Sequence, residues 1–309
     1  MSGPVSESVA TERAVSQTAD APRRADLRRF VLFPSAFALV ALLWEGYKAV
    51  GPANGGRLLG VRLLPRTGDR AMPHVSAMWS RLWKPEVRGG KETIFTVVSR
   101  ATWYSLRVSL LAFLLGTLLG VALAVMMSRV RWLERAFMPY LVASQTVPII
   151  VLGPLLASLL AYASRDLSSE RWIAAVLLGV FLAFFPVALG TLRGLQSTQP
   201  AAVELMDSLA APWWKTLVKL RFPAAVPYIA PSLRLAGAAS VVGVIVAEIS
   251  LGVRAGVGRL ILSYGQDATS DPPKLYTAVF GAAVLGLLMA GLVAAVGHLL
   301  MRNRPKEAT

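Results

Sequence analysis

Residues 106–127 read LRVSLLAFLLGTLLGVALAVMM. As a helix that rises about 1.5 Å per residue, this stretch is long enough to cross about 30 Å of hydrocarbon. Arg107 is its one charged residue. Apolar runs of this length are typical of membrane spans, so we predict an all-α integral membrane protein.

Five further stretches have the same apolar character. They lie at residues 30–50, 136–163, 172–192, 227–251 and 276–301. The whole chain is 55% hydrophobic and only 16% charged, and its mean hydropathy is +0.57. A soluble domain does not need so much apolar surface, so lipid is expected around much of the chain. We therefore predict about six transmembrane helices.

Basic residues orient these spans, because Lys and Arg are retained on the cytoplasmic side of membrane proteins. With the N-terminus inside, three basic segments become cytoplasmic: residues 128–135, 193–222 and 302–309. Residues 1–29 lack an apolar run that would offset ordering entropy, and they are expected to form a disordered cytoplasmic tail. Residues 51–104 become an external loop, and residues 105–301 form a core of five spans.

The external loop at residues 51–104 carries nine Lys and Arg residues. Long translocated loops tolerate such charge better than short ones, so the orientation stands. Within the loop, residues 75–82 and 93–98 alternate apolar and polar side chains at helical spacing. We expect both stretches to form helices at the outer membrane interface.

The span at residues 136–163 is expected to be broken. Gln145, Thr146 and Pro148 interrupt it, and Pro154 follows. Proline removes a backbone donor and kinks helices. The break is either a structural kink or a place where backbone groups line a water-filled path.

The charge and the residue inventory exclude several functions. A net charge of +15 fits cytoplasmic retention of basic loops better than nucleic-acid binding, for which aromatic residues interleaved with basic ones are missing. There is no cysteine, and His74 and His298 stand without other ligands nearby. We therefore expect no metal site, no cofactor in this chain and no enzymatic activity of its own.

A polar segment separates the fourth and fifth predicted spans. Residues 199–223 read QPAAVELMDSLAAPWWKTLVKLRFP, and we call them the coupling segment. They predict two short helices: Pro200 suits a first helical position, Ala210 lies in a tight turn, Pro212 starts the second helix and Pro223 ends it. Glu204 lies early in the first helix, where negative charge complements the macrodipole.

Two uses of the coupling segment are open from its chemistry. Trp213 and Trp214, surrounded by polar residues, are typical of a protein interface that an external motor grips. Alternatively the segment lies on the inner leaflet, with its tryptophans, Lys215 and Lys219 as lipid anchors.

The coupling segment resembles the EAA motif of binding-protein-dependent importer permeases. That motif has Glu-Ala-Ala followed at fixed spacing by Gly, Ile and Leu-Pro; here Glu204, Ala210, Leu220 and Phe222-Pro223 stand at those places. Further matches lie at residues 145–148, 153–155, 224–229, 233–236, 246–248 and 256–261. Together they resemble the nitrate, sulfonate and taurine group, which includes importers of pyrimidine precursors. The resemblance covers residue 106 to the C-terminus.

This chain departs from the motif at two points. Ala210 replaces Gly, which is expected to restrict the turn to negative φ. Leu205 and Met206 replace the small Ala-Ala pair, which suggests a docking surface specialised for its own ATPase.

The resemblance implies a type I ABC importer permease (MetI-like) fold with a cytoplasmic coupling helix, in the bacterial inner membrane with both termini cytoplasmic. It implies three partners: a cytoplasmic ATPase dimer that carries ATP and Mg, a second permease (identical or homologous) and an external substrate-binding protein. The residues it assigns to the ATPase contact are Glu204, Asp207, Ser208, Ala210, Trp213 and Trp214.

Polar residues inside the membrane are candidates for a solute pathway, because they are costly to bury there. The candidates are Gln145, Thr146, Ser240 and Glu248. Glu248 either faces the pathway or pairs with Arg254 or Arg259. Gly116 and Gly120 are spaced for close helix approach.

The alternative functions are an ion-gradient-driven secondary transporter, a membrane-embedded enzyme and an exporter subunit. A secondary transporter usually shows internal repeats and paired intramembrane charges, and neither is obvious here. For an importer, nitrate, a sulfonate, a pyrimidine vitamin precursor and riboflavin-like compounds remain open as substrates, with a heterocyclic or amphipathic solute favoured.

Overall fold

Helices make up most of the computed structural model, which describes residues 35–58, 61–62, 64–163, 171–253 and 255–302. The chain divides into two units, Met1–Met78 and Trp79–Thr309, and each is described by itself. The tail predicted at residues 1–29 and most of the one at 302–309 lie outside the described residues.

The first unit contains a helix over residues 35–50 and the short antiparallel strands β1 (Arg57–Leu58) and β2 (Val61–Arg62). Lys48 ties the end of the helix to the following loop, because its Nζ lies 2.6 Å from Asp69 Oδ1 and 3.3 Å from the carbonyl oxygen of Thr67. The span predicted at residues 30–50 begins outside the described residues, so its full length stays a prediction.

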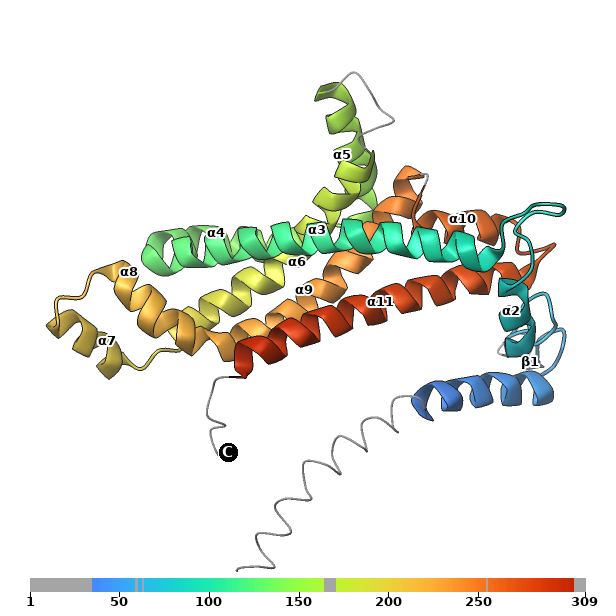
Figure 1. The fold of residues 1–309 in the computed structure, drawn as a ribbon, viewed down its shortest axis with the longest axis horizontal. Helices are drawn as coiled ribbons and strands as arrows, with labels where there is room; N and C mark the ends of the chain where they lie inside the picture. The colour runs from blue at the N-terminus through green and yellow to red at the C-terminus, as the bar shows by residue number, and fades with distance from the viewer. Residues whose placement is uncertain (1–34, 59–60, 63, 164–170, 254, 303–309) are drawn as a thin grey trace, which may run out of the picture. The chain divides into compact units, whose positions relative to one another are not determined.

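The second unit is a bundle of four long helices that run side by side (Figure 1). They are α3 (Ile94–Arg129), α6 (Arg171–Gln196), α9 (Phe222–Leu251) and α11 (Pro272–Met301). Four helices of the described chain are long and apolar enough to span a membrane, and a bent pair makes up to a fifth. The all-α membrane fold is confirmed, while a sixth span stays a prediction.

The bent pair is α4 (Arg131–Ser144) and α5 (Ile149–Ala163), whose axes differ by 104°. The predicted break at residues 145–148 is confirmed. Thr146 closes α4, since its N–H and its hydroxyl both donate to the carbonyl oxygen of Ala143, at 3.0 and 2.8 Å. Pro154 lies inside α5 without interrupting it, and α5 projects from the bundle (Figure 1).

The two predicted interfacial helices had different outcomes. The first is α2 (Val75–Leu82), with the predicted bounds. The second, residues 93–98, does not exist as a separate helix, because Thr93 is the N-cap of α3 and Ile94 its first residue. Ile94 and Val98 are buried beside Tyr264, and this packing extends α3 well beyond the span predicted from hydropathy.

Glycines allow the helices of the bundle to touch backbone to backbone. A Cβ atom on Gly243 of α9 would lie 2.8 Å from Cα of Gly179 and 2.9 Å from the carbonyl oxygen of Leu178 in α6. A Cβ on Gly120 of α3 would lie 2.7 Å from the carbonyl oxygen of Phe184. The predicted close approach at Gly120 is confirmed, and small residues are what membrane helices use for such contacts.

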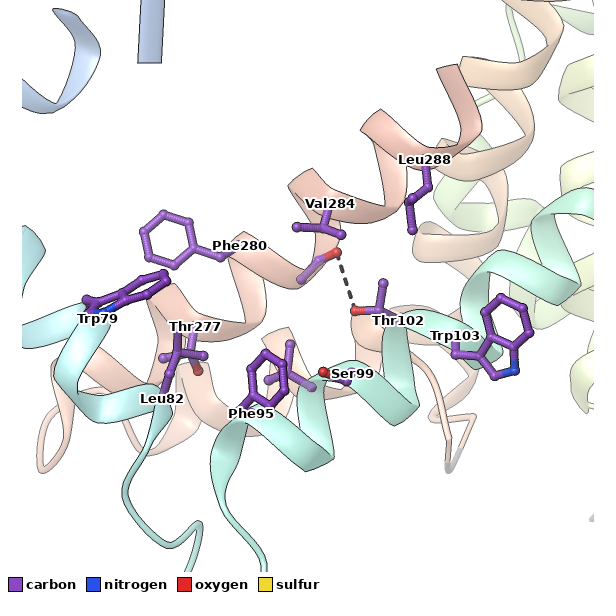
Figure 2. Close-up of a pocket in the computed structure, with 12 residues that line it drawn as sticks. Trp79, Leu82, Phe95, Ser99, Thr102, Trp103, Thr277, Phe280, Val284 and Leu288 are labelled. Carbon is purple, nitrogen blue, oxygen red and sulfur yellow. Dashed lines mark hydrogen bonds between the residues drawn. The ribbon is translucent and has the colours of Figure 1, made fainter. Parts of the chain in front are cut away.

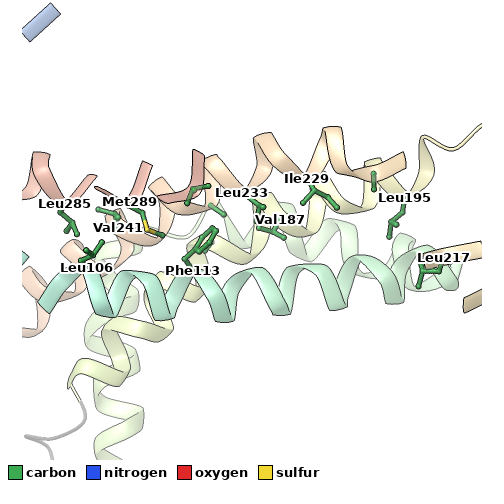
Figure 3. Packing of buried hydrophobic residues seen from close by; sticks show 14 residues of the cluster. Leu106, Phe113, Val187, Leu195, Leu217, Ile229, Leu233, Val241, Leu285 and Met289 are labelled. Atoms are coloured by element: carbon green, nitrogen blue, oxygen red, sulfur yellow. The ribbon is translucent and has the colours of Figure 1, made fainter. Parts of the chain in front are cut away.

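Larger apolar side chains fill the rest of the bundle. The main cluster joins α3, α6, α9 and α11 along most of their length (Figure 3). Its members include Leu106, Phe113, Val187, Leu195, Ile229, Leu233, Leu285 and Met289. The four helices therefore share one core, which gives the segments at the two ends of the bundle a common support.

Candidate functional site: the coupling segment and a buried polar junction

The coupling segment folds into two helical pieces, as predicted. The first is α7 (Pro200–Ser208), which Pro200 begins; the second starts with α8 (Trp213–Thr216) and continues through a π-helix, η1 (Leu217–Arg221). In α7 no residue is buried. The segment therefore offers its side chains to the surroundings of the bundle.

The prediction that Pro223 ends the second helix is wrong. From Trp213 to Leu251 the chain forms one helical stretch of 39 residues, with Pro223 in the first turn of α9. In η1 the N–H of Phe222 bonds to the carbonyl oxygen of Leu217, five residues back. This wider turn relieves the conflict between the proline ring and the preceding turn. The coupling segment is thus continuous with a span.

The prediction of a negative φ at Ala210 is also wrong, because Ala210 has φ +49°. The N–H of Ala211 bonds to the carbonyl oxygen of Met206, and that of Ala210 to the carbonyl oxygen of Asp207, at 3.0 and 2.9 Å. These two bonds form a Schellman motif, which needs a left-handed residue after the helix. Ala210 supplies it despite a steric cost of roughly 1–2 kcal/mol.

The six residues assigned to the ATPase contact differ in exposure. Glu204, Asp207, Ser208, Ala210 and Trp214 are exposed, whereas Trp213 is half-buried. The Trp213 ring packs against the main cluster, and the guanidinium carbon of Arg129 lies 4.8 Å from its centroid. Trp214 is 57% exposed. Trp213 therefore seats the segment on the end of α3, whereas Trp214 stays exposed, with the Lys215 ammonium 5.6 Å from its ring centre.

Glu248 lies at the other end of α9, with 0% of its surface exposed. Its Oε1 accepts a hydrogen bond from the Ser105 hydroxyl at 2.6 Å, and its Oε2 accepts one from the N–H of Gly258 at 2.9 Å. The Ser105 oxygen in turn accepts from the N–H of Val257 at 3.0 Å. A carboxylate is therefore placed at the N-terminus of α10 (Val257–Gln266), where free N–H groups and the helix dipole favour it.

These contacts favour a structural role for Glu248. No ion pair among the described residues includes it, and Arg259 is exposed. Of the alternatives left open for Glu248, pairing with Arg259 is not seen, because the Ser105 hydroxyl and the N–H of Gly258 bond to the carboxylate instead. Arg254 lies outside the described residues.

The other pathway candidates lie apart from Glu248 and have contacts of their own. Gln145 and Thr146 are exposed at the break between α4 and α5. Ser240 is buried in α9, where its hydroxyl donates to the carbonyl oxygen of Gly237 at 2.8 Å. The described hydrogen bonds link none of the four candidates to another. Their place on a solute pathway stays a prediction.

Residues 116–302, more than half of the chain, match the family of the binding-protein-dependent transport system inner membrane component. The chain belongs to this family. It is an ABC transporter permease, as the resemblance of the coupling segment predicted.

The names of this permease's relatives specify different transported solutes. The formylaminopyrimidine transport permease protein of Halalkalibacterium halodurans is 31% identical over 62% of this chain and 73% of its own. The putative aliphatic sulfonates transport permease protein of Bacillus subtilis is 29% identical over 63% and 66%. A solved amino acid ABC transporter with histidines has the same fold, at a TM-score of 0.53 and 18% identity over 67% of this chain and 95% of that one.

Ser105 of the permease was not among the predicted site residues. A single Ser in an apolar span carries no signal by itself, because hydroxyls there usually bond to their own helix. Its partner Glu248 lies 143 residues away. Only the folded bundle brings the two together.

A second polar cluster in the permease holds the other end of α10. The Tyr264 hydroxyl donates to Glu86 Oε1 at 2.8 Å, and the Lys274 ammonium lies 4.4 Å from the centre of the Tyr264 ring. Burial, together with the bond to Glu86, raises the pKa of Tyr264, so the phenol stays protonated as a donor. Nearby, Arg81 pairs with Asp271 at 2.7 Å. The cluster links α2 and the loop after it to α10 and α11.

An apolar groove of about 470 Å³ lies between α2, α3 and α11 of the permease (Figure 2). Trp79, Phe95, Trp103 and Phe280 contribute aromatic rings to it. Thr102 uses its hydroxyl internally, donating to the carbonyl oxygen of Gly281 at 3.4 Å. Among the residues that the structure describes, no charged side chain lines the groove, so this lining lacks the convergent polar groups that would select a polar solute.

The left-handed turn gives a direct test of the local backbone in the permease. Replacing Ala210 with glycine is expected to stabilise the turn by about 1 kcal/mol, because glycine adopts positive φ without the Cβ clash. Hydrogen exchange at the amides of Ala210 and Ala211, followed by mass spectrometry, should slow by roughly fivefold. The control is Ala211→Gly, at a position without positive φ, which should speed exchange. Faster exchange in both variants would contradict the assignment.

Proposed function

We propose that this permease passes a small solute, delivered by an external binding protein, through the membrane by alternating access, driven by a separate ATPase that binds α7 and α8. The observation that carries the proposal is the continuity of α8 with α9. At about 1.5 Å per residue, a helical stretch of 39 residues is roughly 58 Å long. A displacement imposed at Trp214 is therefore conveyed along the full depth of the bundle.

The ATPase is proposed to be a cytoplasmic dimer that supplies ATP and Mg. The basic residues near the coupling segment support a cytoplasmic position: Arg129, Lys215, Lys219 and Arg221 gather where α3 ends and α9 begins. We place both termini on the same side. A second permease, identical or homologous, completes the transmembrane part.

The substrate is proposed to be a heterocyclic vitamin or pyrimidine precursor, with a sulfonate or nitrate as the alternative. Support comes from the relative at 31% identity, whose name specifies formylaminopyrimidine. The sulfonate permease at 29% identity keeps the alternative open. The ligand of the receptor protein encoded beside this gene would identify the substrate class.

Co-purification tests the proposed function. The tagged permease, expressed with its neighbouring ATPase, should retain that ATPase through purification in mild detergent. Trp214→Ala should lower the recovered ATPase at least fivefold, because exposed aromatic anchors dominate interfaces. Trp172→Ala is the matched control: Trp172 is 43% exposed and lies in the first turn of α6, at the end of that helix far from the coupling segment. Equal recovery from both variants, or no ATPase with the unchanged chain, would contradict the proposal.

A further inference from the structure

Helix α10 is attached at its N-terminus to two helices of the bundle at once. Glu248 comes from α9 and Ser105 from α3, and together they bind the N–H groups of Val257 and Gly258. We call Glu248, Ser105, Val257 and Gly258 the α10 junction. All four residues are buried, so water does not compete for these hydrogen bonds.

The junction is built without spare room. A Cβ atom on Gly256 would overlap the Glu248 carboxylate, and one on Gly258 would lie 2.8 Å from the Cβ of Glu248 and 2.6 Å from the carbonyl oxygen of Ile245. Glycine at both positions lets the backbone of α10 approach α9 closely. Because carboxylate, hydroxyl and backbone fill the space, α10 cannot shift against α9 without breaking the junction.

The α10 junction and the coupling segment lie at opposite ends of one helical stretch. Glu248 lies near the end of the helical stretch Trp213–Leu251, and the coupling segment lies at the start. In Figure 1, α7 and α8 are at one end of the bundle and α10 is at the opposite end. A movement of α9 along or about its axis therefore acts on α10 through Glu248.

The C-terminal end of α10 is also held by side chains, so a movement of α10 would reach the segments that they belong to. Tyr264 bonds to Glu86 in the loop between α2 and α3, and Lys274 holds Asp267 at 3.5 Å. The opposite face of α10 is free of buried residues and includes Arg259, Leu262 and Gln266, all exposed. Because hydrogen bonds hold α10 at both ends and one of its faces is exposed, we expect α10 to move as a rigid unit.

We propose that Glu248 and Ser105 are positioning residues that make α10 move with α9 when the coupling segment moves. The inference rests on the proposed function. It assigns to Glu248 a role in the transport cycle that requires no contact with the solute.

The absence of cysteine in this chain makes the movement measurable. Gln266→Cys places one thiol on the exposed face of α10. Its rate of reaction with a maleimide is compared in the assembled transporter with and without a non-hydrolysable ATP analogue. The nucleotide should change the rate at least fivefold. Adding Ser105→Ala should at least halve the change, because the hydrogen-bonded path from Glu248 through the Ser105 hydroxyl to the N–H of Val257 is lost while the ATPase stays bound.

Ser109→Ala is the matched control. Ser109 is also fully buried, one turn further along α3, and its hydroxyl has no hydrogen-bond partner among the described residues. This variant should keep the full nucleotide effect. Glu248→Ala, which also removes the acceptor of the Gly258 N–H, should reduce the change to less than twofold, and adding Ser105→Ala to it should change little further, since residues of one network do not add.

The outcomes separate the inference from the proposed function. If Ser105→Ala keeps the same nucleotide effect as Ser109→Ala, the inference is overturned. If the ATPase co-purifies but Gln266→Cys reacts at the same rate with and without nucleotide, α10 does not move and the inference again fails, while the proposed function stands. Loss of ATPase binding by the Gln266→Cys chain with no further substitution overturns both.

Discussion

Replacing Glu204 with lysine is expected to abolish substrate-stimulated ATP hydrolysis by the assembled transporter while the permease still inserts in the membrane. Glu204 is exposed in α7, and no hydrogen bond or ion pair of its side chain is seen among the described residues, so the change alters a surface charge and little else. Truncating a charge that is paired across an interface costs about 2–5 kcal/mol. At about 1.4 kcal/mol per factor of ten, coupling falls at least about 25-fold.

Hydrolysis is measured in proteoliposomes with and without the loaded receptor, and insertion by the amount of permease in the membrane fraction. Glu204→Gln serves as the graded control: it keeps the shape, removes the charge and should lower the stimulation severalfold without abolishing it. Full stimulation in Glu204→Lys would remove the coupling assignment.

Replacing Gly243 with leucine is expected to destabilise the bundle by about 3 kcal/mol, the upper end of the usual cost of overpacking, because the new side chain meets backbone that cannot move aside. Its Cβ alone would lie 2.8 Å from Cα of Gly179. The measurement is the denaturant concentration at which half of the purified permease unfolds.

Gly291→Leu in α11 is the control, since a Cβ there meets no atom within 4 Å. It should keep the stability of the parent chain to within about 1 kcal/mol, because leucine is a better helix former than glycine. Equal loss in both variants would show that helix packing at Gly243 is not the cause.

Length and hydropathy were sufficient to predict the long helices and the all-α membrane fold, because lipid forces every backbone group to bond within its own segment. The break before α5 was also predictable, since Gln145, Thr146 and Pro148 combine polarity with a missing donor. The extension of α3 to Ile94 was not, because it depends on Ile94 and Val98 packing beside Tyr264. That contact joins residues that are far apart in the chain.

The candidate site was predictable only in part. Motif spacing located the coupling segment and its first helix. It did not reveal the φ of Ala210, which the hydrogen bonds of the turn impose, or the continuity through Pro223, which depends on the π-helix. The partners of Glu248 could not be predicted for another reason. A carboxylate inside a span is expected to bind a basic side chain or a solute, whereas here it accepts hydrogen bonds from a serine hydroxyl and a backbone N–H.

The π-helix η1 lies between α8 and α9, so the orientation of α8 about the helix axis can change independently of the register of α9. Successive residues of an α-helix point about 100° apart, so gaining or losing one residue within η1 turns Trp214 around the axis while α9 keeps its register. Under the proposed function, one inserted or deleted residue in η1 would therefore reorient the surface that binds the ATPase without a change in the span.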